Sequence, residues 1–306
     1  MMTPLVSVCM TTYNHERYIA EAIESVLAQH TSFDFEIVVG EDCSTDSTPT
    51  ICRQYAERYP DKIRLITSAE NVGWRANYRR TIAAARGRYI ALCDGDDRWC
   101  DTEKLQAQFD LLEADSECAM CYTRSERRDF ERGESQIYPP EQGHEDFASM
   151  LRLNTAENST TMARRDLVEQ YYAEVRPDQH PEWLTDDLPM WLWFAANHKI
   201  RFIDRVTATH RIVEGSVSHS RDYRKRIAFG DSLHEIMLWF DKRYNSSHAR
   251  HDILRRAHRN ALWAIASEGS VSEFVGRWWS DVCRSPRLLF CCDAAKIFIK
   301  RRLLRR

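Results

Sequence analysis

The first 125 residues of the chain alternate short apolar runs with longer segments of helical periodicity. The run "LVSVCM" at 5–10 is rich in β-branched residues, as is typical of a buried strand, whereas "YIAEAIESVLAQ" at 18–29 repeats its apolar residues at helical spacing. The pattern predicts right-handed βαβ units, and therefore an α/β fold with a mostly parallel sheet flanked by helices. The same pattern predicts further strands at 35–42, 62–67, 88–94 and 118–123, and further helices at 44–59, 74–85 and 101–115.

The remainder of the chain follows other patterns. Residues 125–150 are charged, which predicts a segment at the surface. Residues 158–172 read as a strand followed by a helix, and residues 184–199 as an aromatic-rich helix. Over 200–212 we expect two short strands joined near Asp204, and from about Tyr223 onward only helices. This predicts one domain over 1–220, with halves 1–125 and 126–220, and a helical C-terminal region over 221–306.

Composition excludes several classes of protein. A formal net charge of -3 provides no global basic field, so we expect no nucleic-acid partner. The start of the chain lacks the basic segment of a secretory signal, and no apolar run reaches the ~20 residues that span a bilayer. The ten cysteines include one lone CxxC, at Cys118 and Cys121, which is a weak zinc or redox signal, so reduced thiols are expected. We therefore expect a cytoplasmic protein.

Three aspartates crowd the end of the strand predicted at 88–94. Asp94, Asp96 and Asp97 repel one another, and a shared divalent cation would relieve that repulsion. Carboxylate oxygens suit Mg²⁺ or Mn²⁺, which often also binds the phosphate oxygens of a substrate. The alternative is an acidic helix-capping turn, which explains Asp101 but not the other three. Ligands of parallel sheets bind beyond the carboxyl ends of the strands, so 11–14, 40–46 and 94–97 should form one site.

These stretches together resemble the nucleotide-sugar-binding half of glycosyltransferase family 2. The resemblance rests on 6–29, 36–48, 71–99 and 104–112, in that family's order and spacing, and extends more loosely to about residue 215. It implies the GT-A fold, with 1–125 binding the nucleotide sugar and 126–220 the acceptor. It also implies metal-dependent inverting transfer from a nucleoside diphosphate sugar, with UDP as the expected nucleotide. The implied acceptor is a saccharide or lipid-linked intermediate of cell-surface polysaccharide or lipopolysaccharide synthesis.

The resemblance assigns roles to residues of the donor half. Asp94 and Asp96 match the DxD motif, whose first acid faces the sugar or ribose and whose second binds the metal, while Asp97 supports them. The loop after the first strand also matches, with Thr11, Tyr13 and Glu16, as do the acids after the second strand, Glu41 and Asp42. Asn71 matches an "NxG" turn with Arg75 nearby, and Arg211 matches an arginine that approaches the diphosphate. The family usually has Asp where Glu41 stands. The donor-binding residues implied in this way are Thr11, Tyr13, Glu16, Glu41, Asp42, Asn71, Arg75, Asp94 and Arg211.

A general base must also take a proton from the acceptor hydroxyl. The resemblance places it in "TDDLPMWLW", where Asp187 fits best and Asp186 is its neighbour. The same position favours a helix N-cap, and Asp187 can fill both roles. Aromatic side chains nearby are candidates for packing against sugar rings, namely Trp183, Trp191, Trp193 and Phe194.

The family's usual histidine position holds Val213 in this chain. His210 and His219 lie nearby, and either could substitute, so His219 joins Asp94 and Asp96 as a candidate metal ligand. The C-terminal segment from Lys296 has six basic residues and no acidic one, mixed with Leu, Ile and Phe. Such a tail suits an amphipathic helix on the inner face of the plasma membrane, and a solvated terminal helix is the alternative.

Two other functions compete with sugar transfer. A phosphatase of the haloacid dehalogenase type needs a nucleophilic Asp after its first strand, and "CMTTYN" supplies none. A catalytically silent protein that binds nucleotide sugars, or acts as a scaffold, would keep the same fold. Candidates for both metal ligand and base argue against it.

Overall fold

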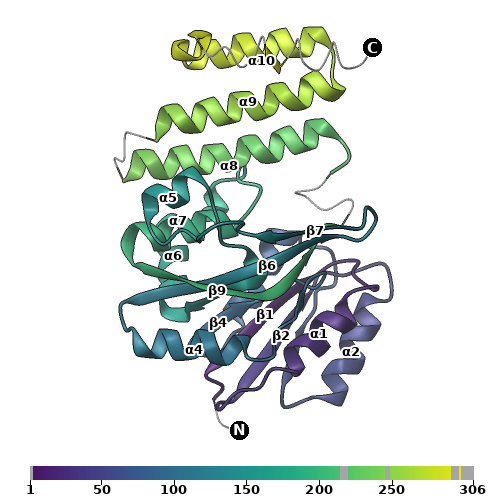
Figure 1. Cartoon of the computed structure of the whole chain (residues 1–306). Helices are drawn as coiled ribbons and strands as arrows, with labels where there is room; N and C mark the ends of the chain where they lie inside the picture. The colour runs from purple at the N-terminus through teal and green to yellow at the C-terminus, as the bar shows by residue number, and fades with distance from the viewer. Residues whose placement is uncertain (1–2, 214–219, 245–248, 291–295, 298–306) are drawn as a thin grey trace. The chain divides into compact units, whose positions relative to one another are not determined.

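The computed structural model describes residues 3–213, 220–244, 249–290 and 296–297 (Figure 1). They form two compact units. The first contains the residues through Arg176 together with Trp193–Ile212, and the second contains Pro177–Leu192 and the described residues from Val213 onward. Helix α7 (Asp187–Asn197) therefore begins in the second unit and ends in the first.

A nine-stranded mixed sheet forms the centre of the first unit. Its order is β3-β2-β1-β4-β8-β6-β9-β5, with β7 paired to the end of β6. β3, β2, β1 and β4 are parallel to one another, whereas β8 joins β4 and β6 as an antiparallel strand. The strands are β1 (Val6–Thr12), β2 (Phe35–Glu41), β3 (Ile63–Ile66), β4 (Tyr89–Leu92), β5 (Arg98–Trp99), β6 (Cys118–Asp129), β7 (Glu134–Tyr138), β8 (Thr161–Arg164) and β9 (Lys199–Arg211).

The parallel strands are buried on both faces, which explains why they read as continuous apolar runs. Val8 and Met10 of β1 belong to the same core cluster as Ile23 of α1. Cys9 points to the other face, where its thiol contacts the Thr81 carbonyl of α3. The other helical elements of this unit are α1 (Ile19–Leu27), α2 (Thr48–Arg58), α3 (Trp74–Ala83), α4 (Lys104–Ala114), α5 (Phe147–Arg152), the 3-10 turn η1 (Asn158–Thr160) and α6 (Arg165–Val175).

The predicted order of strands and helices is confirmed through residue 115, apart from the short strand β5, which was not predicted, and one later prediction is wrong. Residues 200–212 form most of one strand, β9, rather than two. The strand pairing steps from Ile203 to Val206, so Asp204 and Arg205 bulge out of the ladder and carry the charges that suggested a break. The start of the charged stretch at 125–150 is a β-hairpin of β6 and β7, because the polar end of β6 pairs with both β7 and β9.

The second unit consists mainly of three long helices in succession. These are α8 (Tyr223–Arg243), α9 (Arg250–Glu268) and α10 (Val271–Arg284), and the turns η2 (Pro177–Gln179) and η3 (Pro286–Phe290) complete it. Figure 1 shows them layered in sequence order, and α9 contacts both neighbours. A core that includes Leu262, Ile265 and Phe274 joins α9 to α10. No helix among the described residues is long and apolar enough to cross a bilayer.

Candidate active site

The carboxyl ends of β1, β2 and β4 meet at one edge of the sheet, as predicted. β1 lies between β2 and β4, which makes this the switch point of the sheet. The Gly95 amide donates to the Thr11 carbonyl (2.9 Å), and the Asp42 amide donates to the Thr12 carbonyl (3.1 Å). A Cβ at Gly95 would lie 2.8 Å from the Thr12 side chain, so glycine lets the aspartate turn sit directly against β1.

Asp97 is the anchored member of the aspartate cluster. Its side chain is buried, and it accepts hydrogen bonds from the Ser159 hydroxyl (2.6 Å) and the Arg211 amide (2.9 Å). His210 Nδ1 lies 3.2 Å from the same carboxylate. Burial raises the pKa of Asp97, but His210 and these donors outweigh it and hold the pKa below its usual range. Burial in turn lowers the pKa of His210, yet the Asp97 charge raises it to about 10. Asp97 and His210 therefore form an ion pair.

Asp94 is held by a residue far away in the sequence. Asn158 Nδ2 lies 2.8 and 2.9 Å from the two carboxylate oxygens of Asp94, and Thr11 Oγ1 lies 3.5 Å from one of them. Ser159 accepts from the Asp94 amide (3.1 Å) while it donates to Asp97. Burial, followed by the charges of Asp97 and Asp96, raises the pKa of Asp94 to about 8. The turn η1 thus fixes two of the three aspartates.

Asp96 differs from its two neighbours. Its side chain is 21% exposed, and apart from its own amide no described residue donates a hydrogen bond to its carboxylate. His15 Nε2 lies 3.9 Å from the Asp96 carboxylate. His15 Nδ1 is buried without a hydrogen-bond partner among the described residues. Burial, followed by the Asp97 charge, raises the pKa of Asp96. Asp96 is therefore the acid of this cluster with the most lone pairs still available.

The acids after β2 organise the neighbouring loops. The two carboxylate oxygens of Asp42 accept from the amides of Val72 (2.9 Å) and Gly73 (3.0 Å), and Gly73 has a φ of 87° that suits glycine. Asn71 Nδ2 donates to the Asp42 carbonyl (3.1 Å). Glu41 is buried and accepts from the Ser44 amide (2.6 Å). These acids hold the "NxG" turn and the loop after β2 in place.

The loop after β1 is tied to the loop after β2. Glu16 accepts from the Ser47 amide (3.0 Å), and its own amide donates to Asp46 (3.0 Å). Tyr13, earlier in the same loop as Glu16, is exposed. Arg75 Cζ lies 5.0 Å from the ring centroid of the exposed Trp74. The exposed Tyr13 ring lies on the loop after β1, and the exposed Trp74 ring lies at the start of α3.

Arg211 is buried rather than open to solvent. Its guanidinium donates to the Asp96 carbonyl (2.7 Å), pairs with Glu21, and lies 5.2 Å from the Tyr18 ring centroid. It therefore supports the backbone of the aspartate turn from behind. His219 lies outside the described residues.

Asp187 begins helix α7. It accepts hydrogen bonds from the Leu188 amide (2.6 Å) and from the Thr185 hydroxyl. Its neighbour Asp186 is buried. The aromatic residues expected to pack against sugar rings are fully or almost fully buried, so that expectation is wrong: Trp183, Trp191, Trp193 and Phe194 are core residues.

Sequence reasoning missed three residues of this site. Asn158 and Ser159 belong to a stretch that reads as a glycan sequon, and nothing local signals that it contacts Asp94, 64 residues earlier. His15 follows the first strand in "TTYNHER", a position that could have marked it. In the described part of the chain, no three His, Cys, Asp or Glu side chains are grouped so that they could hold a metal ion.

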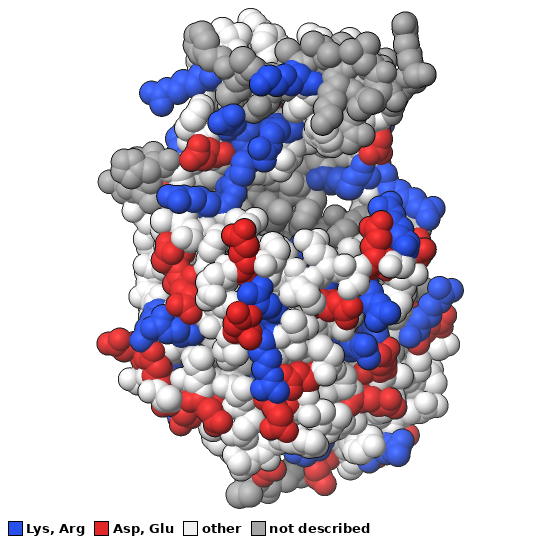
Figure 2. Space-filling view, in the orientation of Figure 1, with Lys and Arg blue, Asp and Glu red and all other residues white. Residues whose placement is uncertain are grey.

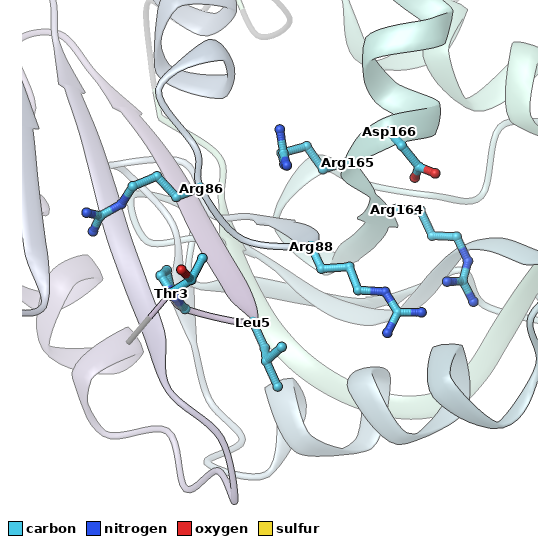
Figure 3. Close-up of a pocket in the computed structure, with 8 residues that line it drawn as sticks. Thr3, Leu5, Arg86, Arg88, Arg164, Arg165 and Asp166 are labelled. Atoms are coloured by element: carbon cyan, nitrogen blue, oxygen red, sulfur yellow. The ribbon is translucent and has the colours of Figure 1, made fainter. Parts of the chain in front are cut away.

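A separate hollow of about 460 Å³ opens at the opposite edge of the sheet, near the start of β1 and β4 (Figure 3). Four arginines line it, but Figure 3 shows their guanidinium groups turned in different directions. Arg86 pairs with Glu36, and Arg88 and Arg164 lie 5.3 and 5.4 Å from the ring centroid of Tyr89. Because these charges do not converge, we assign no anion site to the hollow.

Comparisons with known proteins identify the family of the chain. The family model described as "Glycosyl transferase family 2" matches residues 7–172. An uncharacterized protein of Mycobacterium tuberculosis is 37% identical over 162 residues, which are 52% of this chain and 46% of that protein. The putative teichuronic acid biosynthesis glycosyltransferase TuaG of Bacillus subtilis is 36% identical over 120 residues, 39% of this chain and 46% of TuaG. The chain matches less than half the length of these curated relatives.

Solved structures share the fold. Staphylococcus aureus TarS 1–349, in complex with UDP-GlcNAc, superimposes with a TM-score of 0.59 and 18% identity, over 97% of this chain and 91% of that 1–349 chain. The mannosyltransferase PcManGT of Pyrobaculum calidifontis, in complex with GDP-Man and Mn²⁺, gives a TM-score of 0.56 and 18% identity, over 99% and 87%. At these identities the likeness shows the GT-A-like fold alone. Since the family model covers more than half of the chain, this protein belongs to glycosyltransferase family 2.

Proposed function

We propose that the protein transfers a sugar from a nucleoside diphosphate sugar, with UDP as the expected nucleotide, to a saccharide or lipid-linked acceptor of cell-surface polysaccharide synthesis. One observation carries the proposal: at the switch point, Asp97 and Asp94 are held by hydrogen bonds while Asp96 keeps an open carboxylate. The names of related proteins, and the ligands in the structures with a similar fold, support this class of substrate. TuaG is named for teichuronic acid biosynthesis, and the neighbouring structures contain UDP-GlcNAc and GDP-Man.

The residues at this edge fit a divalent cation. Asp96 offers carboxylate oxygens that no other described residue hydrogen-bonds. Burial, together with the charges of the neighbouring aspartates, raises the pKa of Asp94 and Asp96, and a cation beside them would favour their charged forms. Mg²⁺ or Mn²⁺, held by Asp96 and Asp94 with His219 as the proposed third ligand, would stabilise negative charge on the leaving diphosphate. The Asp97 carboxylate already accepts hydrogen bonds from Ser159 and the Arg211 amide, so we propose that it holds the turn of Asp94 and Asp96 in place and does not bind the cation itself.

The loops after the strands are proposed to bind the donor. Thr11, Asp94 and the exposed Tyr13 lie at the end of β1, and Arg75 is a cation in the first turn of α3, directly after the turn that Asp42 organises. Glu16, Glu41, Asp42 and Asn71 bond to the protein itself, so we propose that they act by holding these loops. Arg211 would likewise act through the Asp96 backbone.

Asp187 is the proposed general base. It would take the proton of the acceptor hydroxyl, whose oxygen then bonds to the anomeric carbon as the bond to the diphosphate breaks. A single displacement of this kind inverts the anomeric centre, and the nucleoside diphosphate leaves. We propose residues 1–220 as the catalytic domain and 221–306 as a helical addition to it.

The test is release of nucleoside diphosphate from a panel of nucleotide sugars with Mn²⁺ or Mg²⁺. We expect at least one donor to be hydrolysed, and Asp96→Asn to reduce that rate by roughly 100-fold or more. Asp110→Asn is the matched control, because this carboxylate is exposed on α4 and should leave the rate unchanged. Near-full activity of Asp96→Asn would overturn the assignment. Donor binding without release of any nucleotide would instead favour the silent binding protein.

A further inference from the structure

Helix α10 exposes an uncharged surface. Val271, Val275 and Trp279 are four residues apart and form one stripe, and they are 45%, 54% and 60% exposed. The exposed positions beside this stripe are the small residues Ser272, Gly276 and Ser280. A surface helix ordinarily presents charged side chains to water, so this face is unusual for a helix that needs only solvent.

The packing of α10 holds this stripe outward. Phe274 is buried in the core shared with α9. Arg277 donates to both carboxylate oxygens of Asp231 on α8 (2.7 and 2.8 Å) and to Asp281 one turn further along α10. The capping box of Ser270 and Glu273 fixes the start of the helix. The buried face is thus already satisfied, and the stripe is a second apolar surface.

The C-terminal region, residues 221–306, has a net charge opposite in sign to that of residues 1–220. Residues 221–306 contain 19 Lys or Arg and 9 Asp or Glu, whereas residues 1–220 contain 24 and 37. The net charges are therefore +10 and -13. Figure 2 shows blue side chains outnumbering red ones over helices α8 to α10 at the top of the view. Exposed Arg284 and Arg287 follow the stripe directly in sequence.

Three occupants could cover an apolar stripe in a basic region, and one fits both properties. Two copies of the chain would bring two strongly positive regions together, which costs electrostatic free energy. A polyanion would satisfy the charges but leave Val275 and Trp279 in water. An anionic bilayer attracts the basic residues and accepts Val and Trp side chains at its interface. We propose that α10 docks on an anionic membrane surface through Val271, Val275 and Trp279. This proposal does not rest on the transfer reaction.

The test is co-sedimentation of the full chain with vesicles of phosphatidylcholine, with or without phosphatidylglycerol. We expect binding to the anionic vesicles that weakens with salt, and a loss of at least about tenfold in affinity for the double variant Val275→Ser, Trp279→Ser. Phe130→Ser is the matched control, since it removes a comparably exposed aromatic (55%) from the other unit and should bind normally. Far-UV circular dichroism and thermal unfolding show whether each variant folds.

Several results would overturn the proposal. Wild-type protein that does not bind anionic vesicles would do so, and so would a folded double variant that binds as tightly as wild type. A lipid-free dimer that the double variant abolishes would assign the stripe to a second copy of the chain. If the double variant fails to fold, Trp279→Gln alone replaces it, with the same expectation of weaker binding.

Discussion

Ser159 links two of the three aspartates, so its hydroxyl should matter more than that of an ordinary serine. It donates to Asp97 at 2.6 Å and accepts from the Asp94 amide at 3.1 Å, and the side chain is buried. Ser159→Ala removes both hydrogen bonds with little change in volume. The buried Asp97 carboxylate loses one donor, and the Asp94 amide loses its acceptor.

The expected cost follows from these two contacts. A hydrogen bond to a charged group contributes about 1.5–3 kcal/mol, and a buried polar group left without a partner costs about 1–3 kcal/mol. Asp94 is only half-buried, so water can partly replace the partner that its amide loses, and the two costs do not add in full. We therefore expect Ser159→Ala to lower the free energy of unfolding by about 2–4 kcal/mol. The loss should be measured by urea unfolding of the full chain at neutral pH.

A second serine supplies the control. Ser135 donates to Glu126 at 2.8 Å, but both side chains are at the surface of the β6–β7 hairpin. Ser135→Ala should therefore change the free energy of unfolding by less than about 0.5 kcal/mol. If Ser159→Ala were as stable as wild type, or if the two variants lost equal stability, the claim that η1 anchors the aspartate cluster would be refuted.

Four further predictions test other parts of the account. Burial lowers the pKa of Lys104 from 10.5 to about 8, so above pH 8 the unfolded chain holds a proton that the folded chain has lost. The free energy of unfolding of wild type, relative to that of Lys104→Met, should therefore rise by about 2–3 kcal/mol between pH 7 and 10. Urea unfolding of the two proteins at each pH measures this difference, and a difference that stays constant with pH would contradict it. Gly95→Ala forces a Cβ to within 2.8 Å of the Thr12 side chain, so nucleotide release should fall at least tenfold while circular dichroism stays unchanged. Asn158→Ala removes both hydrogen bonds from Asn158 Nδ2 to Asp94 and should weaken binding of the nucleotide sugar in the presence of Mn²⁺, as measured by thermal shift; an unchanged shift would contradict this. Truncation after Ser285 removes seven basic residues and one acidic residue and should lower affinity for anionic vesicles, with nucleotide release retained.

The parallel half of the sheet could be predicted from the sequence because its strands are buried on both faces. The runs that became β1, β2 and β4 are apolar without interruption, and the helices between them carry their own periodicity. The polar ends of these strands could also be predicted to meet, because parallel strands place their carboxyl ends at one edge. Asp94, Asp96 and Asp42 were found in this way.

The mixed half could not be predicted as well, because its contacts are not local. The end of β6 is polar, and it becomes a strand only because β7 and β9 flank it. Asn158 reaches Asp94 through the pairing of β8 with β4, which no local pattern announces. Trp191 and Trp193 fit a sugar platform and a core equally well by composition, and only their burial decides.

The central claim is that Asp96 keeps its carboxylate open for a cation that binds together with the donor. Isothermal titration calorimetry of UDP and UDP-sugars, with and without Mn²⁺, tests it most directly when wild type is compared with Asp96→Asn. The account predicts that Mn²⁺ strengthens nucleotide binding to wild type at least tenfold and has little effect on the variant. Equal nucleotide affinity with and without the cation in wild type, or an undiminished cation effect in Asp96→Asn, would contradict it.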